Sequence, residues 1–176
     1  MSGAVYLAGE AVTLRTIEDE DLPFLRDTIN DPAVRYYLGD RGPVNLEQER
    51  EWFEGEAADG ENLNLLVAVD GERAGTVGLH PRVPDDGSTE VGVFLAEQFW
   101  GEGYGTEAVE LVVDYAFREG RAHRVAARVI DGNDASRRVF EKLGFRHEAT
   151  FQEATFHDGA YTDVHWYAVL KEEWRD

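Results

Sequence analysis

The segment from Gln98 to Ala108, QFWGEGYGTEA, carries three glycines at alternate positions, directly after an apolar run and directly before a helical pattern. The free N–H groups at the start of a helix, together with the positive end of its dipole, form an anion site that needs no basic side chain. Glycines in the preceding loop let the backbone approach a phosphate and direct N–H groups toward it. We therefore expect Gly101, Gly103 and Gly105 to hold a pyrophosphate-like group, and a simple tight turn is the alternative.

Other kinds of chemistry find no support in the residue pattern. The loop lacks the Gly-Lys-Ser/Thr of a P-loop, and it follows an antiparallel meander, unlike a dinucleotide fingerprint. The chain has no cysteine, which excludes disulfides, thiolate metal sites and a cysteinyl acyl-enzyme. No nucleophile elbow is present. No metal site is expected, because the histidines are far apart and show no ligand spacing: His80, His123, His147, His157 and His165.

Hydrophobic patterning predicts the elements that must position the glycine loop. Asp70-Gly71 is a hairpin signal, and Asn45 stands three residues before Gln48 at the spacing of a capping box. The N-terminal half predicts a strand over 11–17, helices over 18–30 and 45–58, and strands over 63–69, 73–80 and 90–96.

The C-terminal half predicts alternating helices and strands. A helix runs from the glycine loop to Gly120, and a second begins at Asn133 or Asp134 and ends at Gly144. The remaining predicted elements are strands over 123–130, 145–156 and 160–170. Because a crossover helix joins them, the strands that contain Val91 and Val125 should be parallel neighbours. The sequence thus predicts an α/β (α+β) fold with a mixed sheet, in a single domain over 1–176.

Three stretches resemble one protein family in matching order. WGEGYGTEAVELVVDYAF resembles the acetyl-CoA-binding motif of the GCN5-related N-acetyltransferases (GNAT), specifically of their RimJ/RimL-type branch. NDASRRVFEKLGF and DGAYTDVHWYAVLKEEW are similar to two further motifs of that branch, and VTLRTIEDEDLPFL is similar to its start. The resemblance implies a GNAT-like three-layer fold whose central sheet is mixed, mostly antiparallel and flanked by helices. Two positions differ from the pattern: Trp100 stands where the family usually has Gln or Arg, and Gln152 stands where the branch often has Arg.

The resemblance also implies a mode of cofactor binding. The strands before and after the glycine-loop helix would splay apart, so that the pantetheine arm of acetyl-CoA inserts between them. An N–H near Phe94 or Leu95 would stabilise the oxyanion. The residues implied for cofactor binding are Val93, Phe94, Leu95, Gly101, Gly103, Tyr104, Gly105, Thr106 and Asn133.

Two residues are candidates for proton transfer in direct attack of an amine on the thioester. Glu90, at the start of the strand that leads to the cofactor, would accept the amine proton through water, and a solvated strand-edge acid is the alternative. Ser136 would protonate the departing thiolate, or else form a local backbone bond in the first helical turn. Asn133 is interpreted first as a helix cap.

The expected activity is acetyl transfer from acetyl-CoA to an amine. A protein N-terminal α-amine is the first choice of acceptor because, at pH 7, about a tenth of an amine with a pKa near 8 is neutral, against about four parts in ten thousand for lysine. A small-molecule amine, such as a polyamine or an antibiotic, is the second choice. A non-catalytic acyl-CoA sensor is the alternative from another class.

Charge and hydropathy limit the surroundings in which the protein works. The formal charge is −19, from 36 acidic and 17 basic residues, which disfavours nucleic acid and anionic membranes as partners. No long apolar segment or signal peptide is present, so a cytoplasmic protein is expected, and a homodimer stays open. The acidic residues are dispersed along the chain, and Lys142 and Lys171 are its only lysines. This composition leads to the hypothesis of adaptation to high salt.

Overall fold

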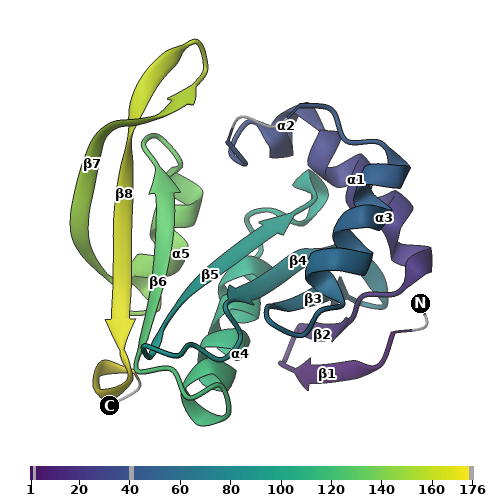
Figure 1. Ribbon diagram of the computed structural model, residues 1–176, viewed down its shortest axis with the longest axis horizontal. Helices are drawn as coiled ribbons and strands as arrows, with labels where there is room; N and C mark the ends of the chain where they lie inside the picture. The colour runs from purple at the N-terminus through teal and green to yellow at the C-terminus, as the bar shows by residue number, and fades with distance from the viewer. Residues whose placement is uncertain (2, 40–41, 175–176) are drawn as a thin grey trace.

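The computed structural model describes residues 1, 3–39 and 42–174. These residues form one eight-stranded sheet in the order β1-β2-β3-β4-β5-β6-β8-β7 (Figure 1). The strands are β1 (Val5–Ala8), β2 (Val12–Thr16), β3 (Leu63–Val69), β4 (Glu72–His80), β5 (Ser88–Leu95), β6 (Arg124–Ile130), β7 (Arg146–His157) and β8 (Ala160–Leu170). β5 and β6 run parallel, whereas the other neighbouring strands are antiparallel. The predicted mixed sheet and its parallel pair are confirmed.

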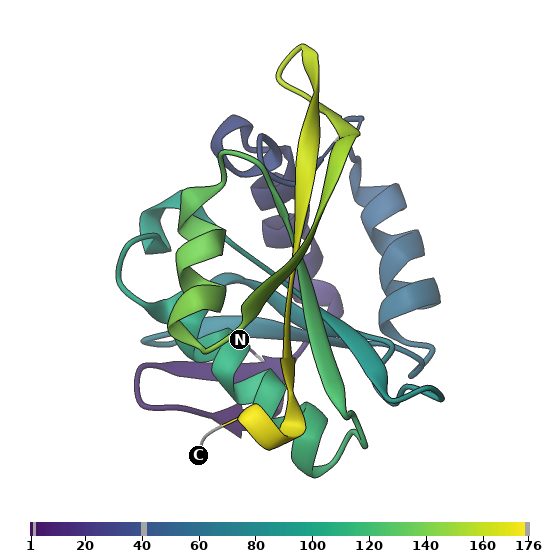
Figure 2. The same cartoon turned by 90° about the vertical axis from the view of Figure 1, so that its left-hand side faces the viewer.

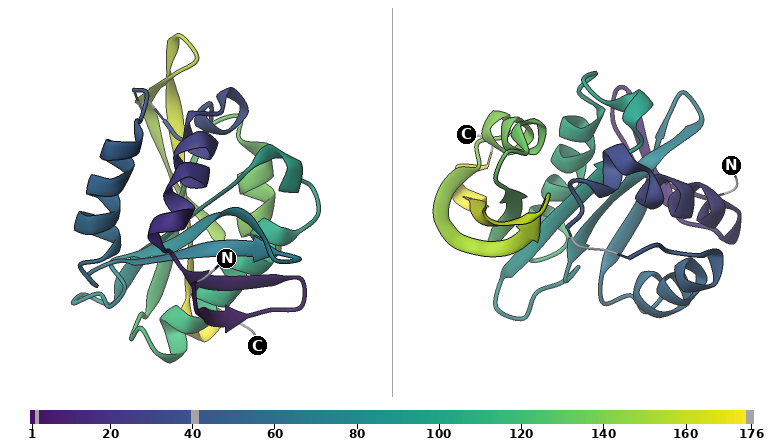
Figure 3. Two further views of the ribbon diagram at one scale, coloured as in Figure 1. Left: turned by 90° about the vertical axis from the view of Figure 1, so that its right-hand side faces the viewer. Right: turned by 90° about the horizontal axis from the view of Figure 1, so that it is seen from above.

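Helices cover both faces of the sheet, which gives three layers (Figure 3). The helices are α1 (Leu22–Asn30), α2 (Pro32–Arg35), α3 (Leu46–Trp52), α4 (Tyr104–Arg118) and α5 (Asp134–Lys142). On one face α4 and α5 enclose the main core with alternate strand residues such as Val67, Val77 and Val91. On the other face a smaller cluster joins α1 and α3 to Leu66. Side chains alternate between faces along each strand, so Leu66 faces α1 and α3 while its neighbours Leu65 and Val67 face α4.

Two parts of the N-terminal half differ from the expected elements. The predicted helix over 18–30 is a 3-10 turn, Asp19–Asp21, followed by α1, because Pro23 is compatible only with a first helical turn. The strand β1 was not predicted. It pairs with β2 through a register shift between Val5 and Leu7, and most of its residues are exposed, so no periodic apolar signal marks it.

The sheet opens between β5 and β6. These strands pair only at Ser88 with Arg124, Thr89 with Val125 and Glu90 with Ala126. Beyond Glu90 they diverge, as Figure 1 shows, while β6 stays paired with β8 along its length and β8 with β7. The β7–β8 hairpin extends past the rest of the sheet (Figure 2). The divergence leaves the last five residues of β5, 91–95, without a strand partner on the β6 side.

Candidate active site

The glycine loop adopts a conformation that requires glycine at two of its three positions. Gly101 has a φ of 79° and Gly103 a φ of 87°, both in the left-handed region. Gly103 caps α4 without a side chain, and the first hydrogen bond inside the helix is donated by Glu107 N–H to Gly103 O at 3.1 Å. The N–H groups of residues 104–106 therefore have no helical partner, which is what the predicted anion site requires.

Gly105 has no such backbone reason to be glycine. A Cβ built at this position would meet only Leu95 Cδ1, at an ordinary contact distance of 3.7 Å. Alanine in the helix would be more favourable than glycine by roughly 0.5–1 kcal/mol. The protein's own packing does not call for glycine here, whereas a phosphate that approaches the backbone would.

The open edge of β5 presents its backbone groups at alternate residues. Ala96 N–H donates to Ala74 O on the β4 side at 2.8 Å, in register with the β4–β5 ladder. Because backbone groups alternate sides along a strand, Phe94 N–H faces β4, and the N–H groups of Val93 and Leu95 face the opening. Of the two oxyanion donors expected from the sequence, the geometry favours Leu95.

Trp100 occupies part of this edge. Its indole Nε1–H donates a hydrogen bond to Leu95 O at 2.8 Å, and its ring lies 6.4 Å from that of Tyr37. The residue that departs from the family pattern therefore joins the glycine loop to the end of β5. It is a neutral side chain and adds no positive charge to the anion site, which relies on backbone N–H groups.

Glu90 lies at the point where the strands separate, but one of its oxygens is already engaged. Arg128 Nε donates to Glu90 Oε1 at 2.7 Å, and the guanidinium carbon lies 5.5 Å from the ring centre of Trp166. Glu90 and Arg128 are 31% and 59% exposed, so both side chains are accessible to an acceptor. Sequence reasoning missed Arg128. Ala126 on β6 is the strand partner of Glu90, and Arg128 follows it by two residues on the same face of the sheet. The expected parallel pairing of the two strands could therefore have indicated Arg128.

Asn133 caps α5, as expected. Its side chain accepts a hydrogen bond from Ser136 N–H at 3.2 Å. The Ser136 hydroxyl forms no hydrogen bond within the part of the chain that the structure describes, so it stays available to another group. The local backbone bond considered for Ser136 is made by its N–H rather than by its hydroxyl.

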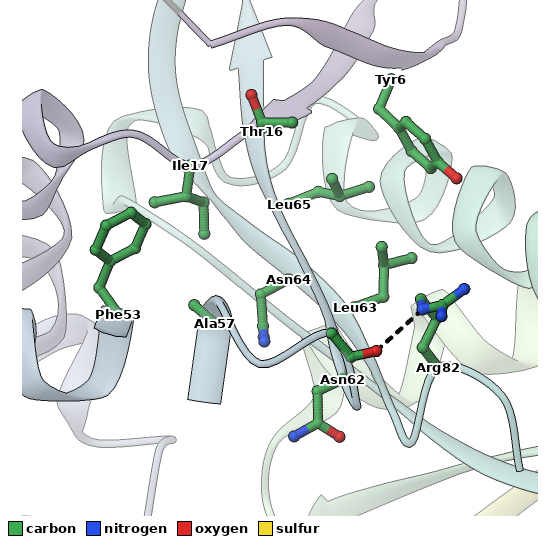
Figure 4. Close-up of a pocket in the computed structure, with 11 residues that line it drawn as sticks. Tyr6, Thr16, Ile17, Phe53, Ala57, Asn62, Leu63, Asn64, Leu65 and Arg82 are labelled. Carbon is green, nitrogen blue, oxygen red and sulfur yellow. Dashed lines mark hydrogen bonds between the residues drawn. The ribbon is translucent and has the colours of Figure 1, made fainter. Parts of the chain in front are cut away.

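Neither of two surface cavities encloses the predicted site, since of its residues only Asn133 lines either of them. The first cavity, of about 250 Å³, lies between the helical turn that follows α3, Phe53–Ala57, and the start of β3 (Figure 4). Arg82 Nε donates to Gly60 O there at 3.2 Å. Asn64 lines the same cavity, and its Nδ2 is buried without a hydrogen-bond partner among the described residues. The predicted cofactor site is thus an open strand edge rather than a closed pocket.

The second cavity, of about 340 Å³, is lined by both His147 and His165. The expectation that the histidines lie far apart is therefore wrong for this pair. Thr150 Oγ1 lies 3.1 Å from both His147 Nε2 and His165 Nδ1, and His165 Nε2 lies 3.0 Å from Asp131 Oδ1. The histidines are 18 positions apart in sequence, and the β7–β8 pairing brings them together. Within residues 1, 3–39 and 42–174, no group of three or more acidic or histidine side chains is arranged to hold a metal ion.

Comparison with known proteins gives the family to which the chain belongs. Residues 11–146 match the family model of the acetyltransferase (GNAT) domain. The uncharacterized N-acetyltransferase p20 of Bacillus licheniformis is 28% identical over 173 residues, covering 94% of this chain and 96% of the relative. No helix in the described residues has the length and apolar character needed to cross a membrane.

Two solved structures share the fold at lower identity. The spermidine N-acetyltransferase of Vibrio cholerae in complex with CoA and spermine superimposes with a TM-score of 0.88 at 22% identity, covering 96% of this chain and all of the other. The ribosomal L7/L12 α-N-protein acetyltransferase RimL in complex with coenzyme A gives 0.84 at 21%, covering 95% and 98%. The chain therefore belongs to the GNAT family and is an acetyl-CoA-dependent N-acetyltransferase.

Proposed function

We propose that the protein acetylates the α-amine at the N-terminus of a protein. The observation that carries this choice is Arg128, whose guanidinium lies beside Glu90 where β5 and β6 separate. A cation at this point would repel an acceptor with several positive charges, whereas it could donate hydrogen bonds to the carbonyl next to an α-amine. The fold shared with RimL, a ribosomal L7/L12 α-N-protein acetyltransferase, is compatible with this acceptor class.

The reaction is direct transfer between the two substrates. The pantetheine amides of acetyl-CoA bond to the open edge of β5 at Val93, and the diphosphate lies on the N–H groups of residues 104–106. The neutral amine attacks the thioester carbonyl carbon, and Leu95 N–H stabilises the oxyanion. Glu90 holds the amine and draws off its proton. The C–S bond then breaks, and the Ser136 hydroxyl protonates the thiolate.

A small polyamine is the second candidate acceptor, and the charge of the molecule favours it. A formal charge of −19 attracts polycations over long distances, most strongly at low ionic strength. The fold shared with the spermidine N-acetyltransferase is compatible with such an acceptor.

The experiment that separates the acceptors measures thiol release from acetyl-CoA together with the mass of the acetylated product. The panel contains a peptide with a free α-amine, the same peptide with a blocked N-terminus and a free lysine, and spermidine. We expect turnover with the free α-amine peptide. Replacement Arg128→Met should raise KM for that peptide by about tenfold, which corresponds to one good hydrogen bond to a charged group. The exposed Arg138→Met is the matched control. Turnover with spermidine alone would contradict the proposal.

A further inference from the structure

A bare patch of the sheet lies beside Glu90, on the face that carries α1 and α3. Gly78 on β4 and Gly92 on β5 are directly opposite each other, and His80 is opposite Glu90 one pleat further on. We call Gly78 and Gly92 the glycine floor. A Cβ at Gly92 would meet no atom within 4 Å, although glycine weakens a strand and leaves nothing to pack. As at Gly105, the fold itself does not require the glycine, which points to a bound group above it.

His80 is held at the margin of this floor. A Cβ built at Gly78 would lie 3.1 Å from His80 Nε2, 3.0 Å from Asn64 Oδ1 and 2.4 Å from Leu63 O. The absence of a side chain at Gly78 therefore makes room for the Leu63 carbonyl and, beside it, for the imidazole. Directly opposite Cβ positions in a sheet are about 5 Å apart, so Nε2 lies within direct or one-water reach of a group that binds over Gly92.

We propose that the acceptor amine binds over the glycine floor and that His80 receives its proton. This assignment rests on the proposed function and completes it, because Glu90 then holds the amine and relays the proton instead of retaining it. Arg128 is hydrogen-bonded to Glu90 Oε1, which leaves one carboxylate oxygen for the amine or for a bridging water.

The charges around His80 fit a group that is neutral before the reaction. Partial burial lowers the pKa of His80 below its ordinary value of about 6.5, against the raising effect of the Glu90 and Glu56 carboxylates. Glu90 faces the ring from β5 and Glu56 from the segment after α3, while Asn64 on β3 is uncharged. At pH 7 the imidazole is mainly neutral and can accept a proton.

The step balances without a further reactant. The nitrogen lone pair forms the C–N bond, the C–S electron pair leaves with sulfur, and Ser136 Oγ–H protonates that sulfur. The amine proton passes through Glu90 or a water to an imidazole nitrogen of His80, and it returns to solvent from the partly exposed ring. The alkoxide of Ser136 regains a proton from solvent.

The test combines kinetics with NMR titration of the labelled histidines. With the free α-amine peptide as acceptor, His80→Gln should lower kcat/KM by about 100-fold and remove the acid limb of the pH profile. Glu90→Gln should lower kcat/KM by about tenfold and move the acid limb to lower pH, because it removes a carboxylate that raises the His80 pKa. The NMR midpoint of His80 should move in the same direction. His123→Gln, at an exposed histidine just before β6 that has no part in the proposed step, is the matched control.

A third variant tests the glycine floor separately from the proton. Gly92→Val fills open space on a strand, where valine is favourable, so it should fold normally, bind acetyl-CoA as before, and raise KM for the peptide at least tenfold. The proposal is overturned if Glu90→Gln abolishes turnover while His80→Gln does not, or if the His80 midpoint does not respond to Glu90→Gln. If the KM for the peptide is unchanged in Gly92→Val, the acceptor amine does not bind over the glycine floor. Absence of turnover with every acceptor overturns the proposed function itself, and this step falls with it.

Discussion

Gly105 and Gly92 are two glycines beside the proposed site whose identity the protein's own packing does not explain. Neither has a positive φ, and a Cβ at either would meet little or nothing. They lie on opposite faces of the sheet beside β5, at the proposed diphosphate site and the proposed acceptor site. Each of these glycines costs stability in the free protein and has open space where a side chain would lie. A bound diphosphate over Gly105 and a bound acceptor over Gly92 would account for both.

The first prediction follows for Gly105. Gly105→Ala should stabilise the free protein by roughly 0.5 kcal/mol, because alanine has the higher helix propensity. It should weaken acetyl-CoA binding by about tenfold, because the new methyl group lies where the diphosphate approaches. Thermal unfolding and calorimetric titration measure the two effects. Gly55→Ala, at an exposed glycine with no neighbour within 4 Å, should leave the affinity unchanged. Unaltered affinity in Gly105→Ala would contradict the diphosphate site.

Ser136 provides a second prediction at this scale. Ser136→Ala should lower kcat by about 10- to 100-fold while the acetyl-CoA dissociation constant stays constant, because only protonation of the thiolate is lost. Ser136→Thr keeps a hydroxyl and should recover most of the rate. The α5 cap would survive both changes, since Asn133 accepts from the backbone N–H of residue 136. Equal rates in all three proteins would remove Ser136 from the mechanism.

At the residue scale, local patterns were predictable and pairwise contacts were not. Asn133 and Asn45 could be identified as helix caps because capping depends on neighbours within three residues, and both act as caps. Arg128 and His80 could not be connected to Glu90 from spacing alone, because the strand registers that join them are set by tertiary pairing.

Among the elements, α1 needs a specific anchor because it covers the acceptor face. Asp21, fully buried before the first turn of α1, accepts hydrogen bonds from Arg73 Nε on β4 at 2.6 Å and from Glu18 N–H at 2.9 Å. A buried carboxylate with a charged partner fixes position more than it adds stability, yet removal of one partner is costly.

The third prediction concerns this anchor. Asp21→Ala should lower the free energy of unfolding by about 3 kcal/mol, because Arg73 loses its buried partner. For a chain of this length the melting temperature should fall by roughly 10 °C. Asp27→Asn breaks an exposed pair with Arg26 and should change stability by less than about 1 kcal/mol. If the two variants have the same melting temperature, the pairing of Asp21 with Arg73 does not hold α1 on the sheet.

Element types were predictable where periodicity was strong, and element boundaries and edges were not. The β3–β4 hairpin at Asp70-Gly71 and the crossover through α4 could be inferred from turn residues and helical spacing. The separation of β5 from β6 beyond Glu90 leaves no trace in composition, and it was expected only from the family resemblance. The strand β1 was missed because an exposed edge strand carries little apolar pattern.

At the scale of the molecule, the two halves on either side of the opening meet through aromatic side chains. Tyr36 OH donates to Asp158 Oδ2 at 3.1 Å, and the Tyr36 ring lies 4.4 Å from that of His157 at the tip of the β7–β8 hairpin. The hydrogen bond to Asp158 raises the pKa of Tyr36, so the phenol stays protonated near neutral pH. These contacts link the segment after α2 to the C-terminal hairpin.

The net charge leads to the fourth prediction. With a formal charge of −19, self-repulsion should weaken the fold in dilute buffer. The screening length falls from about 10 Å at 0.1 M salt to about 3 Å at 1 M. We expect the melting temperature to rise by roughly 10 °C or more between 0.1 M and 2 M KCl. Sucrose stabilises through exclusion without screening charge and serves as the control. A melting temperature independent of KCl would contradict adaptation to high salt.

The central claim is that acetyl-CoA binds along the opening between β5 and β6, on the backbone amides of β5 and of the start of α4. Amide hydrogen exchange, followed residue by residue by NMR as acetyl-CoA is added, tests it most directly. We expect slower exchange at Val93, Leu95 and residues 104–106, with no change at Phe94, whose N–H already faces β4. Unchanged exchange at the first set, with protection elsewhere in the chain, would contradict the account.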